Sequence, residues 1–412
     1  MAFKYRDIGF VADTSSFDYD ECIDQALGSL HDEGRYRVFT DLARRAGQFP
    51  RAWDHSGVTP REITVWCSND YLGMGQHKVV LDAMHTALDA SGAGSGGTRN
   101  ISGTTHYHVA LEMEIANWHK KESALIHTSA FVANEWTLIS LTKIIEDIEF
   151  VSDDNNHASL IQGILKSKAK KHLFKHNNME DLEEKLKAVK GTPCIIFESV
   201  YSMEGDVGTI KEILDLADKY KAITYIDEVH AVGLYGETGA GWLEKIGMQD
   251  RVDIVSGSFS KAVGLHGGYI AGDKEIVDAI RSVSPGFIFT TSIPPVICAG
   301  ALASVKYLKD VGGKELRSLH QEKAMELKTL LTDYNIEVYP NETHLVPVMV
   351  RDPIKCKQIS DTLLYDHDIY VQPINYPTVA KGTERLRFAP TPLHTDAMIS
   401  DLADKLNEVY HD

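Results

Sequence analysis

Cysteine, long apolar runs and positive charge are all scarce in this sequence of 412 residues. The five cysteines are scattered, odd in number and never spaced as CxxC (Cys22, Cys67, Cys194, Cys298 and Cys356). This pattern predicts neither a disulfide framework nor a zinc site, so we expect no bound metal and a reducing, cytoplasmic location. No apolar run approaches the roughly 20 residues that span a bilayer, so no membrane partner is expected.

The charge balance is acidic. Lysine and arginine number 42 against 59 acidic residues, which leaves a net charge of −17. Such a balance argues against nucleic acid or an anionic membrane as the main partner. Local lysines, such as those within 166–171, still suit small phosphorylated ligands. The first residues lack the apolar core of a signal peptide and include acids, so we expect no targeting segment.

The sequence does contain a regular alternation between residues 108 and 270. Helical periodicity covers 108–120, 131–145, 157–167, 179–189 and 210–220. Short apolar, β-branched runs lie at 124–126, 150–151, 172–174, 194–197, 223–226, 252–255 and 267–271. This alternation predicts an α/β fold with a mostly parallel sheet that is covered by helices on both faces.

Three regions are expected along the chain. Residues 1–60 are an N-terminal extension and helical segment, loose over 1–16 and helical over 19–31. Residues 61–295 form the large α/β domain, with a further strand at 62–67 and a helix at 79–88. Residues 296–412 form a smaller α+β domain, with helices at 294–311, 314–334, 356–366 and 395–410 and strands at 336–339, 345–350, 369–373 and 385–388.

Two strand ends carry the strongest chemical signal. One apolar run ends in Asp227, and another is followed after a few residues by Lys261. In open α/β sheets this carboxyl edge is where ligands bind. Pyridoxal phosphate (PLP) needs a lysine for its Schiff base and an aspartate that keeps its pyridine nitrogen protonated. Taken alone, either residue fits a turn or a solvated loop better, but the flanking residues favour the cofactor.

Three neighbouring features support a PLP site. His230, three residues after Asp227, could reach the phenolic oxygen of the cofactor, or could be a core histidine bonded to backbone. Residues 128–134 join a strand to a helix, where free N–H groups can cradle a phosphate, although an ordinary helix cap looks identical. His157 follows another strand and could stack on the cofactor ring or simply start a helix.

Arginines suggest substrates that carry carboxylates. Arg385 and Arg387 alternate with apolar residues on a strand, so both point to one face. If one turns inward it would clamp a carboxylate, whereas surface arginines on an edge strand are the open alternative. Arg37, in a basic, aromatic turn, is a second candidate or a solvated helix end. The glycine-rich segment 92–104 suits close approach to a ligand or a second subunit, or is a flexible loop.

With these residues in place, the chain resembles the α-oxoamine synthases, which are fold type I PLP enzymes that condense an amino acid with an acyl-CoA. Within that group it resembles the 5-aminolevulinate synthases, over residues 22–410. The most specific segments are EGRYRVF (33–39), VWCSNDYLGMGQH (65–77), GAGSGGTRNISGTTHYH (92–108), FESVYSMEGD (197–206), YIDEVHAVGLYG (225–236), PGFIFTTSIPP (285–295) and IYVQPINYPTVAKGTERLRF (369–388).

The resemblance implies a role for each candidate residue. The catalytic residues would be Lys261, which forms the Schiff base, Asp227 at the pyridine nitrogen and His157 over the ring. The other cofactor contacts would be His230 and Ser202 at the phenolic oxygen, and Ser129, Ala130, Phe131 and Ser258 at the phosphate, with Thr290 and Thr291 reaching it from a second subunit. The substrate contacts would be Arg387 for the glycine carboxylate, Arg37, Asn69 and Thr98 for the succinyl end, and Ser152, Lys171 and Thr378 along the acyl-CoA path.

The resemblance also implies the reaction. A homodimer with active sites at its subunit interface would condense glycine with succinyl-CoA, giving 5-aminolevulinate, CoA and CO2 for tetrapyrrole biosynthesis or for a secondary pathway. The open alternatives are a sibling enzyme for another acyl-CoA or amino acid, and a PLP lyase or aminotransferase on the same fold. The chain departs from the resemblance at Phe259 and Ser260, at 237–241 and at 380–381, which bears on turnover and loop gating rather than on reaction type.

Overall fold

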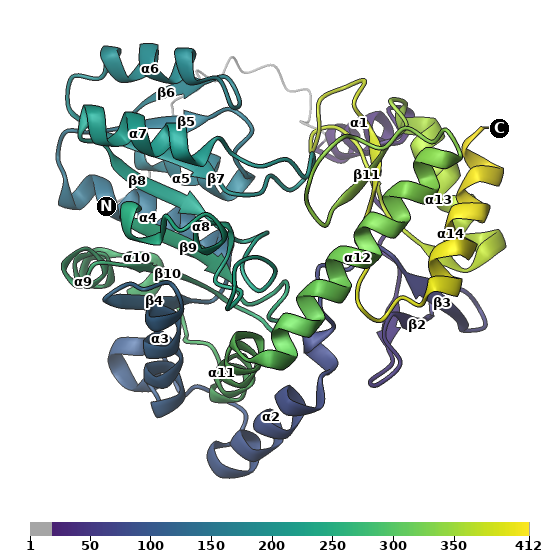
Figure 1. Cartoon of the computed structure of the whole chain (residues 1–412), viewed down its shortest axis with the longest axis horizontal. Helices are drawn as coiled ribbons and strands as arrows, with labels where there is room; N and C mark the ends of the chain where they lie inside the picture. Colours follow the sequence, from purple (N-terminus) through teal and green to yellow (C-terminus); the bar gives the residue numbers. More distant parts are fainter. Residues whose placement is uncertain (1–18, 412) are drawn as a thin grey trace.

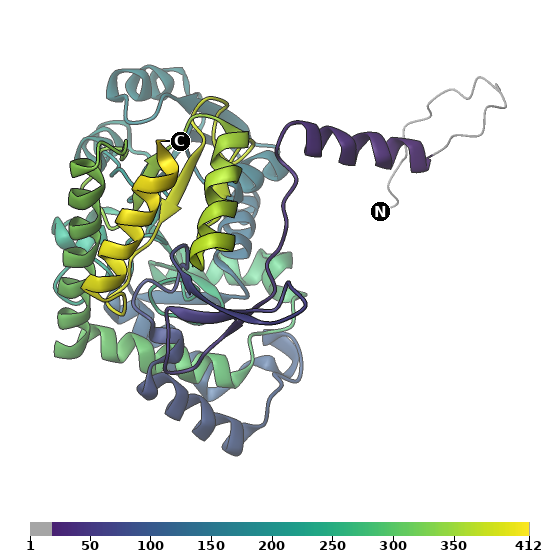
Figure 2. The ribbon, with the colours of Figure 1, turned by 90° about the vertical axis from the view of Figure 1, so that its right-hand side faces the viewer.

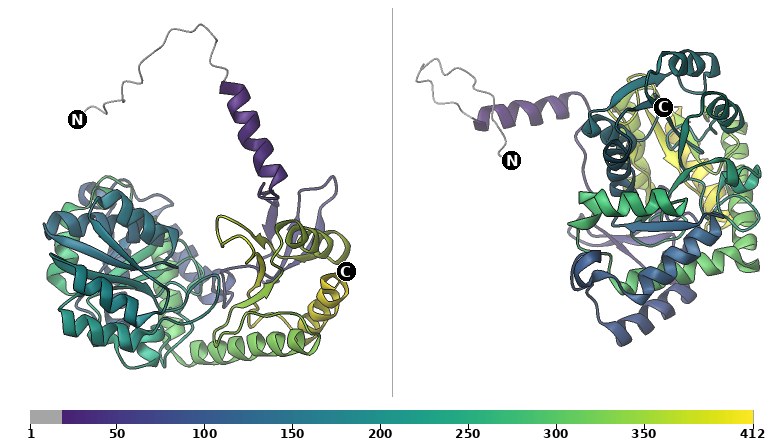
Figure 3. Two further views of the ribbon diagram at one scale, coloured as in Figure 1. Left: turned by 90° about the horizontal axis from the view of Figure 1, so that it is seen from above. Right: turned by 90° about the vertical axis from the view of Figure 1, so that its left-hand side faces the viewer.

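The computed structural model describes residues 19–411, so the loose extension expected over residues 1–16 lies outside the described residues. Two lobes lie side by side, and helix α12 (Val311–Asp333) runs from one to the other (Figure 1; Figure 3). The larger lobe contains the central sheet, and the smaller lobe contains the C-terminal helix. Within residues 19–411, no helix combines the length and the apolar character needed to cross a membrane.

The large lobe is built on a seven-stranded sheet in the order β4-β10-β9-β8-β7-β5-β6. Its strands are β4 (Ser123–His127), β5 (Ile148–Asp153), β6 (Lys170–Phe174), β7 (Thr192–Glu198), β8 (Ile223–Asp227), β9 (Ile254–Ser258) and β10 (Gly268–Gly272). The five strands from β9 to β6 are parallel, and β10 is antiparallel to both of its neighbours. The predicted mostly parallel sheet is therefore confirmed.

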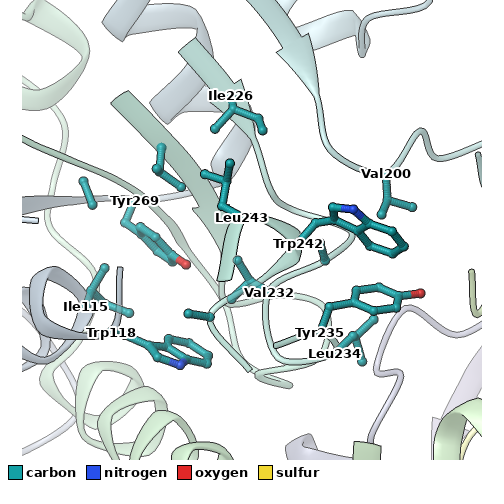
Figure 4. Packing of buried hydrophobic residues seen from close by; sticks show 14 of the residues in the cluster. Ile115, Trp118, Val200, Ile226, Val232, Leu234, Tyr235, Trp242, Leu243 and Tyr269 are labelled. Carbon is teal, nitrogen blue, oxygen red and sulfur yellow. The ribbon is translucent and has the colours of Figure 1, made fainter. Parts of the chain in front are cut away.

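Helices cover both faces of this sheet because successive strand residues point to opposite sides. On β7, Ile195 and Phe197 pack into one buried cluster, whereas Cys194 and Ile196 pack into another. The first cluster lies under α3 (His106–Trp118), α6 (Met179–Ala188), α7 (Ile210–Tyr220) and α11 (Pro295–Lys309), and the second under α4 (Ala130–Ile144), α5 (Ala158–Ser167), α9 (Lys274–Val283) and α10 (Pro285–Ile288). Figure 4 shows part of the first cluster, in which the rings of Tyr235 and Trp242 lie 4.6 Å apart.

The small lobe contains a three-stranded antiparallel sheet in the order β11-β14-β13. Its elements are β11 (Val346–Met349), β13 (Pro373–Ile374) and β14 (Arg385–Phe388), with α14 (Asp396–Tyr410) packed against both α12 and α13 (Pro353–His367). Leu386 and Phe388 enter the core of this lobe, as the alternation on β14 predicts. The strand predicted at 336–339 is wrong, because that segment makes only a single bridge, from Val338 to Val348.

A second, four-stranded sheet joins distant parts of the chain in the order β1-β2-β3-β12. Its strands are β1 (Leu42–Arg44), β2 (Arg51–Asp54), β3 (Arg61–Val65) and β12 (Ile369–Tyr370). The sequence patterns did not predict β1 and β2. β1 pairs with β2, and β2 pairs with β3 across the boundary expected at residue 60. The single strand predicted at 369–373 is split between two sheets, since Pro373 has no N–H with which to continue the β12 ladder.

The remaining helices of the first hundred residues match their predictions. Helix α1 (Tyr19–Asp32) has no buried residue and projects from the body of the molecule (Figure 2). Gly34 follows it with a φ of 64°, a left-handed conformation in which glycine ends helices readily. Helix α2 (Lys78–Ser91) packs against α11 and leads into the glycine-rich segment.

Candidate active site

The carboxyl ends of the parallel strands meet at one edge of the large sheet. Asp227 is the last residue of β8, and Glu198 lies beside it at the end of β7. β9 ends at Ser258, shortly before Lys261, and His157 follows β5. The predicted candidates on these four strands are thus brought together by the topology, as expected for ligand sites in open α/β sheets.

Asp227 is a buried carboxylate held in a fixed orientation. Its Oδ2 accepts a 2.6 Å hydrogen bond from the Asn134 side chain, and its Oδ1 accepts one of 2.8 Å from the Val229 N–H. Burial raises the pKa of Asp227, while these donors and the nearby His157 and Lys261 oppose the rise. A buried carboxylate with no full charge bonded to it suits a protonated pyridine nitrogen, which would supply that charge.

Sequence reasoning gave Asn134 no role, although it is the centre of this network. Its amide nitrogen also donates to Ser159 at 3.0 Å, and its oxygen accepts from Tyr225 at 2.7 Å and from Ser256 at 2.5 Å. Because every side-chain bond is used, the amide cannot rotate without leaving a buried hydroxyl unpaired. Asn134 therefore fixes the carboxylate of Asp227 from helix α4.

Lys261 has the protonation behaviour that a Schiff-base lysine needs. Burial and the positive charge of Arg387 lower its pKa to about 8, against the opposing effect of Asp227 and Glu198. An amine with that pKa is neutral in a minority of molecules near physiological pH, many more than for an ordinary lysine, so a nitrogen lone pair is available to an aldehyde. The site therefore supplies a nucleophile and a later proton acceptor in the same group.

His157 begins helix α5, which was one of the two roles expected for it. Its ring Nδ1 accepts from the Ser159 backbone N–H at 3.2 Å, and the backbone N–H of His157 donates to Glu198 Oε1 at 2.5 Å. Reduced hydration of the ring and the charge of Lys261 lower its pKa, whereas Asp227 opposes them. Burial and the charge of Asp227 raise the pKa of Glu198 well above its ordinary value. Glu198 was missed, although a polar residue at a parallel strand end is the same signal that found Asp227.

The segment expected to cradle the phosphate lies where α4 meets β10. Ser129 caps α4 by accepting from the Val132 N–H at 3.1 Å, and helix geometry leaves the N–H groups of Ala130 and Phe131 pointing out of the first turn. A Cβ atom on Gly268 would lie 2.2 Å from the Ala130 nitrogen, so glycine permits this close approach. Gly268 also pairs with Ser258 in the sheet, which brings that hydroxyl to the cradle.

His230 is buried and bonded to Tyr71, whose hydroxyl lies 2.9 Å from His230 Nδ1. The alternative prediction was a core histidine bonded to backbone, but the partner of this ring nitrogen is the phenol of Tyr71. Burial and the charges of Lys261 and Arg387 hold the pKa of His230 well below its ordinary value. The Tyr71 hydroxyl also donates to Asn69 at 3.1 Å. Tyr71 was not predicted as a site residue.

Arg387 and Arg385 are both buried on the central strand of the small-lobe sheet, which excludes the surface alternative. Arg387 donates to the Ser202 carbonyl and to Asn69 Oδ1, both at 2.9 Å. Its buried Nε has no hydrogen-bond partner among the residues described. Arg385 instead donates to Met203 and Thr383 carbonyls and pairs with Glu204 at 3.1 Å. Arg385 is thus paired with a carboxylate, whereas no ion pair among the described residues includes Arg387, which leaves the charge of Arg387 for a substrate carboxylate.

Of the residues predicted for the acyl-CoA end, Asn69 lies at the site, bonded to Arg387. The others lie at separate places in a single chain. Arg37 donates to Thr378 at 2.9 Å in a cavity of about 460 Å³ lined by residues within 34–40 and 357–378. Thr98 forms a bridge with Thr291, the neighbour of Thr290, in the glycine-rich region. Lys171 is exposed on β6, whereas Ser152 is buried and accepts from Asn156 at 2.8 Å.

Comparison with known proteins gives a family and close relatives. The model of the family "Aminotransferase class I and II" matches residues 61–406. The chain is 54% identical to 5-aminolevulinate synthase 1 of Cereibacter sphaeroides and 52% identical to 5-aminolevulinate synthase of Paracoccus denitrificans, in each case over 95% of this chain and 97% of the relative. A serine palmitoyltransferase from S. paucimobilis with a bound PLP–myriocin aldimine is 27% identical and superposes with a TM-score of 0.85, over 95% of this chain and 97% of that one.

Proposed function

The chain belongs to the 5-aminolevulinate synthase family, and from this premise we propose that it condenses glycine with succinyl-CoA to give 5-aminolevulinate, CoA and CO2. The observation that carries the proposal is the combination of Lys261 and Asp227 at one edge of the large sheet with Arg387 of the small lobe, whose Nε has no hydrogen-bond partner among the described residues. The first two suit PLP, and the third suits the carboxylate of an amino acid.

PLP is the cofactor, and the residues described fit it. Bound there, it supplies an electron sink that makes the Cα proton of glycine acidic. Asp227 would hold the pyridine nitrogen in its protonated form. Ser129, Ala130, Phe131 and Ser258 would bind the phosphate, His230 and Ser202 would contact the phenolic oxygen, and His157 would lie over the ring.

Lys261 and Arg387 then perform the chain's own part of the chemistry. Arg387 would orient glycine by its carboxylate, with two of its nitrogens already held by Ser202 and Asn69. The neutral amine of Lys261, whose pKa is about 8, would accept the Cα proton. His157 would donate to the thioester oxygen as negative charge develops there.

A homodimer would complete the site. Thr290 and Thr291 would reach the phosphate of a second copy, and Arg37, Asn69 and Thr98 would recognise the succinyl end, with Ser152, Lys171 and Thr378 on the acyl-CoA path. Large apolar side chains exposed near the glycine-rich segment support such an interface (Ile101, Met113 and Phe289, at 79%, 69% and 79% exposure). We place the enzyme in the cytoplasm. We also place the boundary between its two larger domains at residue 295.

The experiment is to incubate the PLP-loaded enzyme with glycine and a panel of acyl-CoAs, and to measure both free CoA and the aminoketone. We expect release with succinyl-CoA well above that with acetyl-CoA or longer acyl-CoAs. No CoA release with succinyl-CoA would overturn the proposal, and preference for another acyl-CoA would indicate the sibling enzyme. Transamination or amine release without CoA release would indicate an aminotransferase or a lyase.

Arg37 tests the succinyl assignment. Arg37→Leu should raise the KM for succinyl-CoA much more than the KM for glycine, because a second carboxylate needs a cation. Arg35→Leu is the matched control, since Arg35 lies in the same turn but pairs with Glu33 at 2.9 Å. Equal effects of Arg37→Leu on both substrates would refute the role of Arg37.

A further inference from the structure

A short hairpin connects the large lobe to the substrate arginine. Residues 200–207 leave the end of β7 toward the small lobe, and a bridge between Val200 and Val207 closes the hairpin (Figure 1). Inside it, the Tyr201 N–H donates to the Asp206 carbonyl at 3.0 Å. The 200–207 hairpin therefore moves as one unit, and its tip carries the Ser202 carbonyl that binds Arg387.

The small lobe contacts the hairpin through backbone carbonyls. Arg385 donates to the Met203 carbonyl at 2.9 Å, and Thr343 donates to that of Gly205 at 2.6 Å. These bonds join the hairpin to the small lobe. They do not attach it to the large sheet, where the other candidate residues of the site lie. The anchor on that side must come from the large lobe.

The buried Tyr201 of the hairpin gives one such contact, since its hydroxyl accepts from the Glu198 N–H at 3.3 Å. The charged anchor is His176, which follows β6. Its Nε2 lies 2.7 Å from an oxygen of Asp206, and its Nδ1 lies 3.0 Å from an oxygen of Asp153 at the end of β5. Because a carboxylate only accepts hydrogen bonds, both ring nitrogens must donate, so the ring is an imidazolium. Burial opposes this charge, but the bonds to the two aspartates outweigh it and raise the pKa of His176 to about 10.

The remaining neighbours of the ring leave it no other role. The ring of Tyr201 packs edge-on at 4.4 Å, and the backbone N–H of His176 donates to Asp154 Oδ1 at 2.8 Å. Asn177 adds a 3.1 Å bond to the Val207 carbonyl at the base of the hairpin. Without the imidazolium, Asp153, whose side chain is fully buried, and Asp206 would face each other as like charges.

We propose that His176 is a positioning residue that holds the 200–207 hairpin, and through the Ser202 carbonyl holds Arg387, in register with the large-lobe part of the active site. This inference depends on the proposed function at one point, which is that Arg387 binds the carboxylate of glycine. A bidentate clamp tolerates little displacement, so loosening the hairpin weakens binding of the amino acid. Of the residues predicted to bind the acyl-CoA, only Asn69 contacts Arg387, so acyl-CoA binding depends on this clamp much less.

The test compares the PLP-loaded wild type with His176→Gln, which removes the cation. We expect the KM for glycine to rise by about ten-fold or more, while the KM for succinyl-CoA stays within about two-fold. His176→Arg retains a cation between the two aspartates and should restore most of the glycine affinity. His172→Gln is the matched control, since it breaks a 2.7 Å bridge to Glu149 elsewhere on β6 and should change neither KM.

An unchanged glycine KM in His176→Gln, or an equal rise in both KM values, would overturn the inference. If His176→Gln does not fold, Asp206→Asn is the second variant, because it keeps the cation and its bond to Asp153. It should still raise the KM for glycine without raising that for succinyl-CoA. A result without this selectivity would also overturn the inference. Glycine affinity can also be measured at equilibrium from the cofactor absorbance. That readout tests His176 even if the wild type fails to release CoA from succinyl-CoA, which would refute the proposed function alone.

Discussion

Replacing Asn134 by leucine tests how the site controls its cofactor. Leucine has the same branched heavy-atom skeleton as asparagine but cannot donate to Asp227 Oδ2, which now receives a 2.6 Å bond. Asp227 would keep only the 2.8 Å bond from the Val229 N–H. A hydrogen bond to a charged group contributes about 1.5–3 kcal/mol, so the charged carboxylate loses that much stabilisation.

The loss should appear in PLP affinity. At about 1.4 kcal/mol for each ten-fold change, the dissociation constant of PLP should rise roughly 10- to 150-fold. The assay is a spectrophotometric titration of the apo-protein with PLP, alongside a thermal unfolding curve. Asn134→Leu should also lower thermal stability, because the hydroxyls of Tyr225 and Ser256 lose their acceptor.

A matched control separates these two effects. Tyr225→Phe removes the hydroxyl that donates to Asn134 at 2.7 Å but leaves the bond from Asn134 to Asp227 in place. It should lower stability while changing the PLP dissociation constant by no more than about three-fold. An Asn134→Leu variant that folds and binds PLP within two-fold of the wild type would refute the idea that this amide maintains the charge of Asp227.

Three further predictions follow from the same contacts. PLP capture by the apo-protein should accelerate as pH rises through a midpoint near 8, because burial and Arg387 lower the pKa of Lys261 to about 8; stopped-flow absorbance showing a midpoint near 10 would contradict this. Arg387→Lys should raise the KM for glycine about 10- to 100-fold with little effect on succinyl-CoA, since one ammonium cannot bond Ser202, Asn69 and a carboxylate together, and steady-state kinetics with both substrates checks it. The raised pKa of His176, about 10, means that its bridge stabilises the fold fully below about pH 6.5 and less as pH rises toward 10. The difference in unfolding free energy between wild type and His176→Gln, roughly 1–3 kcal/mol in urea titrations, should therefore shrink over that range, and a constant difference would argue against a charged ring.

Local sequence patterns were sufficient to place a site residue when its position depends only on the strand that carries it. Asp227 lies directly after a buried run, and the alternation on β14 placed both of its arginines on one face. The same reasoning could have selected Glu198, at the end of β7. It failed for β1 and β2, because three or four residues are too few to display a period of two.

Contacts between distant segments were beyond reach of such patterns. Asn134 meets Asp227 across 93 positions, and Arg387 meets Asn69 across 318. These pairs depend on how α4 lies over the sheet and how the two lobes approach, which side-chain packing decides rather than local periodicity. The 336–339 segment shows the converse, since its apolar residues look like a strand but find only one bridging partner.

By itself, then, the sequence determined the sheet type and the cofactor chemistry, because strand ends and the residues on them are encoded within a few neighbouring positions. The tertiary structure alone decided that Arg385 pairs with Glu204 while the buried Nε of Arg387 has no hydrogen-bond partner among the described residues, and that His176 lies between two carboxylates. Both outcomes depend on which polar groups are buried together. That is a property of the packed chain, since a buried donor or charge takes its role from the partners that replace water around it.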